Sequence, residues 1–121
     1  MICIEGEVIH GKKIGRALGF PTANMSLQGY EDIERGVYRS EVEIDGVRYR
    51  AMSNVGIRPS VGGKELLLET HVINFSGDLY GKCLRICLIE KLRDEQRFAS
   101  IGDLKEQLLR DYNRIINNQN G

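Results

Sequence analysis

The stretch of sequence that decides the fold of this protein is Leu66-Leu67-Leu68-Glu69-Thr70-His71-Val72-Ile73-Asn74-Phe75. Its length and composition predict a strand, and apolar side chains fall on both faces of that strand. Because both faces must be covered, we expect the interior of a small closed barrel on one side and a packed helix on the other. The sequence therefore predicts an all-β barrel with one added helix.

Apolar alternation elsewhere predicts the remaining strands of the sheet. Asp45-Gly46 is a strong signal for a type I′ turn, so two of these strands are expected to form a hairpin around it. Residues 56–64 contain Pro59 and Gly62-Gly63 and are predicted to form a loop. Strands are predicted at residues 2–8, 38–44, 47–55 and 83–89.

The end of the chain predicts the helix. Ser100 is the expected N-cap, and Asp103 follows it at capping-box spacing. Residues 117–121 are polar and are expected to fray. Five or six mostly antiparallel strands followed by one helix are typical of a small closed barrel. Apolar residues recur at helical spacing at Ile101, Leu104, Leu108, Tyr112 and Ile115.

Composition favours one ordinary globular domain spanning residues 1–121, with 41% hydrophobic and 28% charged residues. The 17 basic and 17 acidic residues cancel, which argues against a broad nucleic-acid-binding surface. Aromatic residues, at 7%, are few for a barrel that stacks single-stranded bases. No apolar run approaches the ~20 residues that cross a bilayer, and the N-terminus lacks a secretory signal. We therefore expect a cytoplasmic protein that binds neither nucleic acid nor membrane.

The three cysteines, Cys3, Cys83 and Cys87, fit no zinc signature. Cys83 and Cys87 would share one face of a strand but lie roughly 13 Å apart, too far for a disulfide. All three are expected to be small buried residues in a reducing compartment. The alternative is one reactive thiol among them.

The densest candidate for function is the run Gly11-Lys12-Lys13-Ile14-Gly15-Arg16-Ala17-Leu18-Gly19-Phe20-Pro21-Thr22-Ala23-Asn24. Its glycines let backbone N–H groups approach an anion, and three basic side chains add positive charge. It is not a P-loop, because no Gly-Lys-Ser/Thr follows at the required spacing. Thr22 and Asn24 project from one face of an extended segment, where their oxygens could reach Mg²⁺ or its phosphate ligands. The alternatives are a flexible barrel connection and local turn hydrogen bonding.

Glu69 is the second candidate, because a carboxylate rarely stands inside a strongly apolar strand without a reason. Alternation places it on the same face as His71. A carboxylate in a partly dry cavity is a candidate general base. The alternatives are an exposed charge on an edge strand and an ion pair with an arginine. We interpret His71 as mainly structural, a hydrogen-bonded neighbour of the carboxylate.

The third candidate is the charged segment Leu92-Arg93-Asp94-Glu95-Gln96-Arg97-Phe98-Ala99-Ser100, which leads into the helix. Its single aromatic ring could cap a planar ligand. The competing interpretation is a solvated connection in which Phe98 packs against the helix as a hydrophobic staple. From these residues alone, the solvated connection is favoured.

Six motifs occur in order over nearly the whole chain: Leu18-Gly19-Phe20-Pro21-Thr22-Ala23-Asn24, Gly36-Val37-Tyr38, Asn54-Val55-Gly56-Ile57-Arg58-Pro59, Glu69-Thr70-His71, Phe75-Ser76-Gly77-Asp78-Leu79-Tyr80-Gly81 and the segment 92–100. In this order they resemble the riboflavin kinase family. Six ordered motifs are far more specific than any one of them.

The resemblance implies a six-stranded Greek-key closed barrel with a C-terminal α-helix packed outside. It also implies Mg²⁺-dependent transfer of the γ-phosphoryl group of ATP to the 5′-hydroxyl of riboflavin, giving FMN and ADP. By motif position, Glu69 would be the catalytic base. Residues 11–20 and 92–100 would form two flaps, one on either side of the substrate cleft, and would close to exclude water.

The resemblance also implies the binding residues. Thr22 and Asn24 would hold the metal. The nucleotide would be bound by Gly11, Arg16, Thr22 and Asn24. The flavin would lie near Arg97, Phe98 and Ser100.

Many bacterial relatives carry an adenylyltransferase domain that makes FAD. Because Met1 opens directly into the first expected strand, we expect this chain to make FMN only, with another domain or protein completing FAD synthesis. The alternative to a kinase is a non-catalytic barrel that binds flavin or nucleotide. Thr22, Asn24 and Glu69 are all present, which argues against that alternative.

Overall fold

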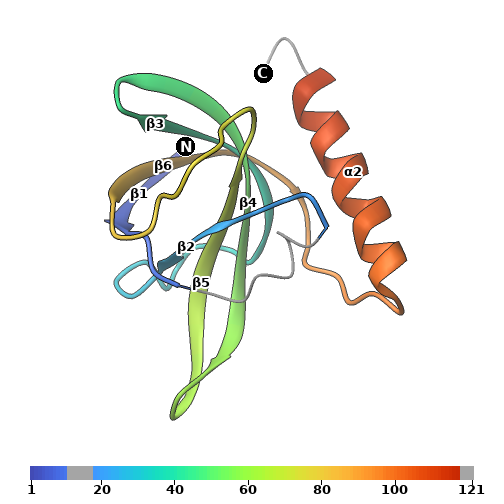
Figure 1. Cartoon of the computed structure of the whole chain (residues 1–121). Coiled ribbons are helices and arrows are strands. Elements are labelled where there is room, and N and C mark those ends of the chain that lie inside the picture. Colours follow the sequence, from blue (N-terminus) through green and yellow to red (C-terminus); the bar gives the residue numbers. More distant parts are fainter. Residues whose placement is uncertain (11–17, 118–121) are drawn as a thin grey trace.

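The computed structural model describes residues 1–10 and 18–117 of the chain. Within these residues lie β1 (Ile2–Glu7), β2 (Ala23–Ser26), β3 (Gly36–Ile44), β4 (Val47–Ser60), β5 (Gly63–Val72), β6 (Cys83–Arg93) and the helix α2 (Ile101–Asn117) (Figure 1). The predicted turn at Asp45-Gly46 joins β3 to β4. Both turn residues have positive φ, 50° and 82°, as a type I′ turn requires.

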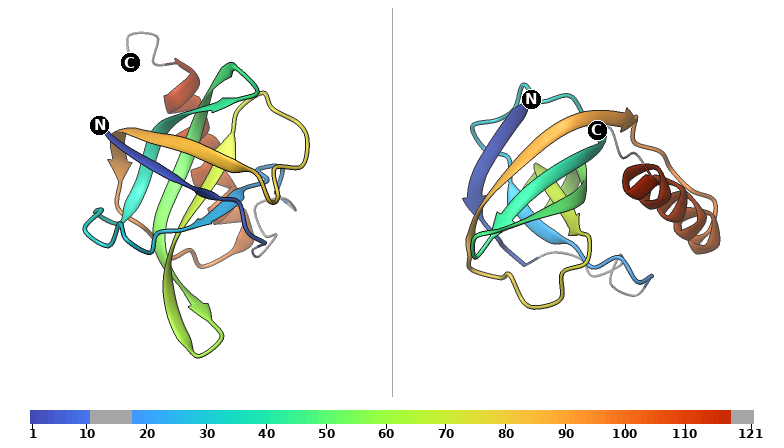
Figure 2. Two further views of the ribbon diagram at one scale, coloured as in Figure 1. Left: turned by 90° about the vertical axis from the view of Figure 1, so that its left-hand side faces the viewer. Right: turned by 90° about the horizontal axis from the view of Figure 1, so that it is seen from above.

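The strands form one antiparallel sheet in the order β1-β6-β3-β4-β5-β2. β3, β4 and β5 follow one another, and β6 returns to lie beside β3, which is the Greek-key connection. The backbone N–H of Ile9 donates to the carbonyl of Asn24 over 2.8 Å, so the chain after β1 reaches β2. The sheet is therefore a nearly closed barrel, with α2 lying outside it (Figure 2). The predicted fold is confirmed.

The strand predicted at residues 66–75 has other bounds: β5 begins at Gly63 and ends at Val72, and Ile73 and Asn74 lie in the turn that follows. Two apolar clusters explain why this stretch is apolar on both faces. One cluster fills the barrel and includes Leu68 and Val72. The other lies between the barrel and α2 and joins Ile73 to Ile115 of the helix. Each face is therefore covered as expected, one by the barrel interior and the other in part by the helix.

A chain of three buried hydroxyl groups crosses the barrel interior beside these apolar residues. Ser40 Oγ lies 2.7 Å from Ser53 Oγ, and Ser53 Oγ lies 2.8 Å from Thr70 Oγ1. The three residues are at most 1% exposed, so each hydroxyl depends on its neighbours for a hydrogen bond. This polar chain ties β3, β4 and β5 together in one register.

The helix begins at the predicted cap. Ser100 Oγ accepts a hydrogen bond of 3.1 Å from the backbone N–H of Asp103, and the Ser100 carbonyl accepts from Leu104. At the other end, Arg50 donates to the carbonyls of Ile115 and Ile116. Both ends of α2 therefore have partners for backbone groups that a helix leaves unbonded. The expected fraying of residues 117–121 falls mostly on residues 118–121, which lie outside the described residues.

The predicted loop at residues 56–64 is wrong. β4 continues to Ser60 and β5 begins at Gly63, so this region is a hairpin that projects from the barrel at the lower end of Figure 1. β3 pairs with β4 only as far as Val55, so beyond that point β4 is an edge strand. Pro59 is tolerated there because one side of an edge strand needs no N–H donor.

The prediction of three reduced, buried cysteines is also wrong. Cys3 of β1 and Cys87 of β6 are directly opposite in the sheet and are joined by a disulfide. Cys83 is a free, exposed thiol. Strand order could not be predicted from the spacing of the cysteines, so this pairing was missed. The cytoplasmic location, which rested partly on free thiols, stays a prediction. No helix in the described part of the chain has the length and apolar character needed to cross a bilayer.

The disulfide joins residues 84 positions apart in sequence, so it restricts the unfolded chain strongly. Reduction should lower the free energy of unfolding by about 2–4 kcal/mol. Urea unfolding with and without dithiothreitol, in a Cys83→Ser background, measures the effect. The same background with Cys3→Ser and Cys87→Ser serves as the control and should not respond to the reductant. Equal midpoints in the reduced and oxidised parent would contradict the prediction.

Candidate active site

A cleft of about 1390 Å³ opens on the outer face of the barrel. Its walls come from β2, β4 and β5, from residues 94–98 after β6 (the 94–98 segment), and from Leu104 and Leu108 of α2. Five of the predicted site residues line it: Thr22, Asn24, Glu69, Arg97 and Phe98. The structure thus brings together parts of the chain that are more than seventy positions apart.

Strand pairing places three polar side chains in one row across the cleft wall. Glu69 of β5 is directly opposite Asn24 of β2 on one side and Asn54 of β4 on the other. Residues directly opposite in antiparallel strands have their Cβ atoms about 4.5–5.5 Å apart. Asn24 is only 5% exposed. A carboxylate and two amides therefore converge on one partly dry surface.

The carboxylate of Glu69 forms an ion pair with Arg58. Glu69 Oε1 lies 2.8 Å from Arg58 Nη2, and the two side chains are 21% and 29% exposed. No N–H is aligned with this oxygen, so Glu69 Oε1 has no hydrogen-bond partner among the described residues, and neither has Asn54 Oδ1. Glu69 Oε1 has the guanidinium of Arg58 beside it, whereas Asn54 Oδ1 has no donor among the described residues, which is unusual for a buried acceptor. Asn54 Oδ1 is therefore the acceptor in this row that lacks a partner.

The ion pair was one of the alternatives that the sequence left open for Glu69. It does not remove the carboxylate from the cleft, because both members of the pair line the same wall. Asn54 and Arg58 were not predicted as site residues. The sequence feature that could have indicated them is the Asn-Val-Gly-Ile-Arg-Pro motif. The pairing of β4 with β5 is what places this motif beside Glu69.

His71 holds the entry to β2 in place. Its Nδ1 atom lies 2.8 Å from the carbonyl oxygen of Pro21, so this nitrogen carries the proton and donates. The ring of Phe20 meets the His71 ring edge-on at 5.2 Å between centroids. These contacts fix the residues before Thr22. These contacts support a structural role for His71, but its partner is a backbone carbonyl and not the Glu69 carboxylate, and the ring also lines the cleft.

The 94–98 segment is tied to the barrel by charged contacts at its start. Glu95 Oε2 accepts a hydrogen bond of 3.1 Å from Arg58. Lys91 donates hydrogen bonds to Asp94 and Glu34, over 2.5 and 2.6 Å. These bonds raise the pKa of Lys91, and the bond from Lys91 holds the pKa of Asp94 below its usual value. The segment that carries Arg97 and Phe98 is thus anchored.

Of the three remaining predicted site residues, the structure places only Ser100. The hydroxyl of Ser100 accepts the hydrogen bond that caps α2, and Ser100 does not line the cleft. Gly11 and Arg16 lie outside the described residues. Their proposed contacts with a nucleotide rest on the motif alone.

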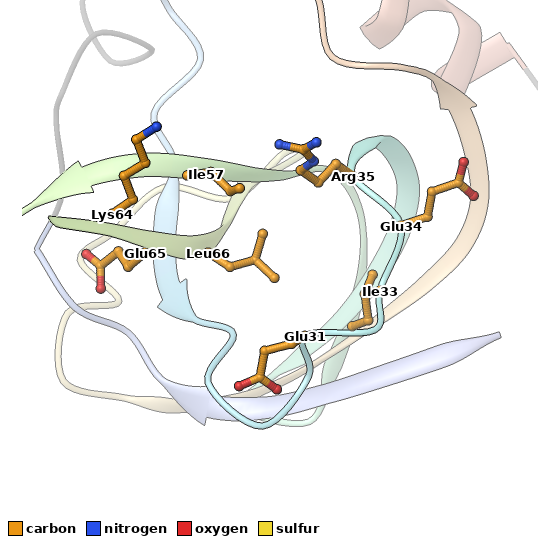
Figure 3. Close-up of a pocket in the computed structure, with 8 residues that line it drawn as sticks. All are labelled: Glu31, Ile33, Glu34, Arg35, Ile57, Lys64, Glu65 and Leu66. Atoms are coloured by element: carbon orange, nitrogen blue, oxygen red, sulfur yellow. The ribbon is translucent and has the colours of Figure 1, made fainter.

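A smaller hollow of about 430 Å³ adjoins the cleft at the base of the β4–β5 hairpin (Figure 3). Leu66 lies in its middle. The cationic ends of Arg35 and Lys64 lie on one side, and the carboxylates of Glu31 and Glu65 lie on the other. Both cationic side chains also line the main cleft. The hollow therefore extends the cleft with a rim of mixed charge.

Comparison with known proteins gives the family. The family model described as "Flavokinase: Riboflavin kinase" matches residues 1–118. The chain belongs to the riboflavin kinase family. This confirms the resemblance that the six motifs indicated.

Curated relatives of this chain include bifunctional proteins. The chain is 44% identical over 109 residues to a bifunctional riboflavin kinase/FMN adenylyltransferase of Pseudomonas fluorescens, and 43% identical to that of Escherichia coli strain K12. Each match covers 89% of this chain and 35% of the relative. The chain thus spans about a third of the length of these relatives.

Solved structures share the architecture of the domain. A Streptococcus pneumoniae protein described as a macrolide-efflux protein matches with a TM-score of 0.81 and 32% identity, over 95% of this chain and 38% of its own. The riboflavin kinase of Trypanosoma brucei matches with a TM-score of 0.64 over 95% of this chain and 77% of its own. At 22% identity, the second match shows a shared fold.

An ion pair fixes the helical wall of the cleft. Arg93, at the end of β6, donates to both oxygens of Asp111 in α2, with a shortest distance of 2.8 Å. Gln107 donates a further hydrogen bond to Asp111, which is only 4% exposed. Because the pair joins the end of β6 to α2, it holds the helix in position against the barrel. Arg93 also lines the cleft.

Asp111→Ala should lower the free energy of unfolding by about 3 kcal/mol, the lower end of the range for breaking a buried ion pair, because Arg93 keeps some contact with solvent. Urea unfolding measures the change. Glu106→Ala is the matched control: it removes the partner of Arg110 in an exposed pair and should cost about 0.5 kcal/mol or less. Equal losses in the two variants would show that the Arg93–Asp111 pair does not fix the helix.

Proposed function

We propose that this domain is a riboflavin kinase, transferring the γ-phosphoryl group of ATP to the 5′-hydroxyl of riboflavin to give FMN and ADP. One observation carries the proposal beyond family membership. The carboxylate of Glu69 lies directly opposite Asn24 in a cleft that Thr22 also lines. A base and a set of phosphate- or metal-binding oxygens therefore share one surface.

Glu69 acts as the general base in this proposal. As the ribityl oxygen attacks the γ-phosphorus, its proton passes to the carboxylate of Glu69, while the bond from the γ-phosphorus to the bridging oxygen breaks and ADP leaves. Phosphoryl transfer depends mainly on positioning and on neutralising phosphate charge. The backbone of β5 is held on both sides by strand pairing, so the carboxylate is presented from a rigid element.

The donor set beside Glu69 fits Mg²⁺. The hydroxyl of Thr22 and the amide oxygen of Asn24 are the hard oxygen ligands that Mg²⁺ prefers, and Asn54 Oδ1 is a buried acceptor in the same row. Thr22 and Asn24 would hold the ion, which would neutralise phosphate charge when bound. By motif position, Gly11 and Arg16 complete the nucleotide site.

The flavin end of the cleft is formed by the 94–98 segment and α2. Phe98 is half-buried, and Leu104 and Leu108 provide apolar surface on the facing wall. An apolar and aromatic surface with a cation from Arg97 suits a planar, polar-edged ring. Ser100 stays a prediction, because its hydroxyl already caps the helix. The FMN produced would pass to an adenylyltransferase, the activity joined to this domain in its curated relatives.

Glu69→Gln should lower kcat for FMN formation by roughly 10²–10⁴ while flavin binding is kept, because the amide cannot accept the proton. Incubation with riboflavin and MgATP, followed by chromatography, measures FMN directly. Glu43→Gln, an exposed β3 residue outside the cleft, should behave as wild type. If the wild-type chain binds flavin but forms no FMN, the non-catalytic barrel replaces the kinase.

Thr22→Ala should raise the KM for MgATP more than the dissociation constant for riboflavin, because only the nucleotide and its metal need the hydroxyl. Kinetics at varied MgATP and flavin fluorescence titration provide the two measurements. Thermal unfolding checks that the variant is folded. An equal loss of both affinities would indicate general damage to the cleft and would remove Thr22 from the metal site.

A further inference from the structure

Arg58 lies between two carboxylates that come from different parts of the chain. Its Nη2 atom is 2.8 Å from Glu69 Oε1 and 3.1 Å from Glu95 Oε2. Glu69 stands within β5, whereas Glu95 belongs to the 94–98 segment that follows β6. One guanidinium group therefore connects the strand that carries the proposed base to the segment that carries Arg97 and Phe98.

Gly56 makes room for this connection. Asn54, Gly56 and Arg58 alternate on one face of β4, and Glu69 is directly opposite Asn54. To reach Glu69, the side chain of Arg58 turns back along its own strand, past Gly56. A Cβ atom on Gly56 would overlap Arg58 Nη1 and the carboxylate of Glu95. The backbone of Gly56 has no positive φ, so the obstacle to a larger residue is these two side chains.

The surroundings make the three-residue arrangement more than an exposed ion pair. The side chains of Arg58, Glu69 and Glu95 are between 21% and 29% exposed, so solvent screens them only in part. Arg58 Nη1 also donates to the carbonyl oxygen of Ile57 over 3.0 Å, which fixes the plane of the guanidinium. With the plane fixed in this way, the single Nη2 atom that contacts both carboxylates has a set position, which restricts the positions of Glu69 and Glu95.

We propose that Arg58 is a positioning residue that acts through Glu69 and Glu95. It holds the Glu69 carboxylate in its place beside Asn24 and Asn54, and it holds the 94–98 segment against β4. The kinetic part of this inference rests on the proposed function, because the position of Glu69 affects a rate only if Glu69 accepts the substrate's proton. The structural part, the link between β4 and the segment, is independent of that function.

The two partners of Arg58 give different kinetic signatures. Arg58→Gln releases both, so it should lower kcat by roughly tenfold to a hundredfold and also raise the KM for riboflavin. Glu95→Gln releases only the segment, so it should raise the KM for riboflavin while kcat stays within about twofold of wild type. Arg58→Lys keeps the charge without the fork and should restore part of the lost kcat. A general loss of structure would not produce this split.

Gly56→Ala tests the same link without changing any charge. The added methyl group should displace Arg58 from Glu95 and lower kcat in the same direction as Arg58→Gln. Arg85→Gln is the matched control, since it removes the guanidinium from an exposed pair with Glu5 on β1 and β6. It should leave both kinetic constants unchanged.

Amide hydrogen exchange of residues 94–98, measured without substrates, tests the link independently of activity. Exchange should become faster in Arg58→Gln, Glu95→Gln and Gly56→Ala, and the Arg58→Gln/Glu95→Gln double variant should be no faster than the single variants. Arg85→Gln should match wild type. If wild type forms no FMN, the proposed function fails and the exchange rates still decide the link.

Three results would overturn the inference. They are wild-type exchange in Arg58→Gln, additive effects in the double variant, and an unchanged kcat in Arg58→Gln when wild type is active. Thermal unfolding of every variant confirms that it is folded. If Arg58→Gln does not fold, Gly56→Ala and Arg58→Lys replace it in the same measurements. Wild-type exchange rates and wild-type kinetics in both variants would then overturn the inference.

Discussion

The register of β5 against β2 and β4 is the constraint on which the candidate site depends. It alone places Asn24, Glu69 and Asn54 in one row. Because side chains alternate between the faces of a strand, a slip of one residue would turn Glu69 into the barrel. The opposite face of β5 prevents that slip. Thr70 is 1% exposed and its hydroxyl is bonded to Ser53, so moving it outward would break a buried hydrogen bond and open the core.

The helix α2 covers one part of the outer face of β5, which becomes core, and leaves the other part exposed to the cleft. At the end of the strand, Ile73 is covered by α2 through Ile115. Farther back along the same face, Leu67 and Glu69 line the cleft. The apolar residues of this face thus serve two purposes, and the ion pair between α2 and the end of β6 holds the division between them. A barrel closed on all sides would have left no partly dry surface for a carboxylate.

The elements that could be predicted from the sequence are those with local signals. Alternation located five of the six strands but not β2, helical spacing and Ser100 located α2, and the need to cover two faces indicated a barrel with an outer helix. What could not be predicted depends on which strands become neighbours. Residues 56–64 carry local loop signals, yet residues 56–60 extend β4 because residues 63–67 of β5 pair with them. The Cys3–Cys87 bridge and the contact of Arg58 with Glu69 likewise depend on strand order and register, which no spacing in the sequence indicates.

The charge of the cleft bears on how a triphosphate would be held. Among the described residues, five basic and five acidic side chains line it, so the formal charge of this part of the cleft is zero, like that of the whole chain. A neutral cleft gives little long-range attraction for a polyanion, and Arg58 is already shared by two carboxylates. In the proposed reaction, the positive charge that phosphoryl transfer needs would come from a divalent ion and from the basic residues Lys12, Lys13 and Arg16 of the sequence. The glycine-rich run would then contribute charge, and the strands would position the reacting groups.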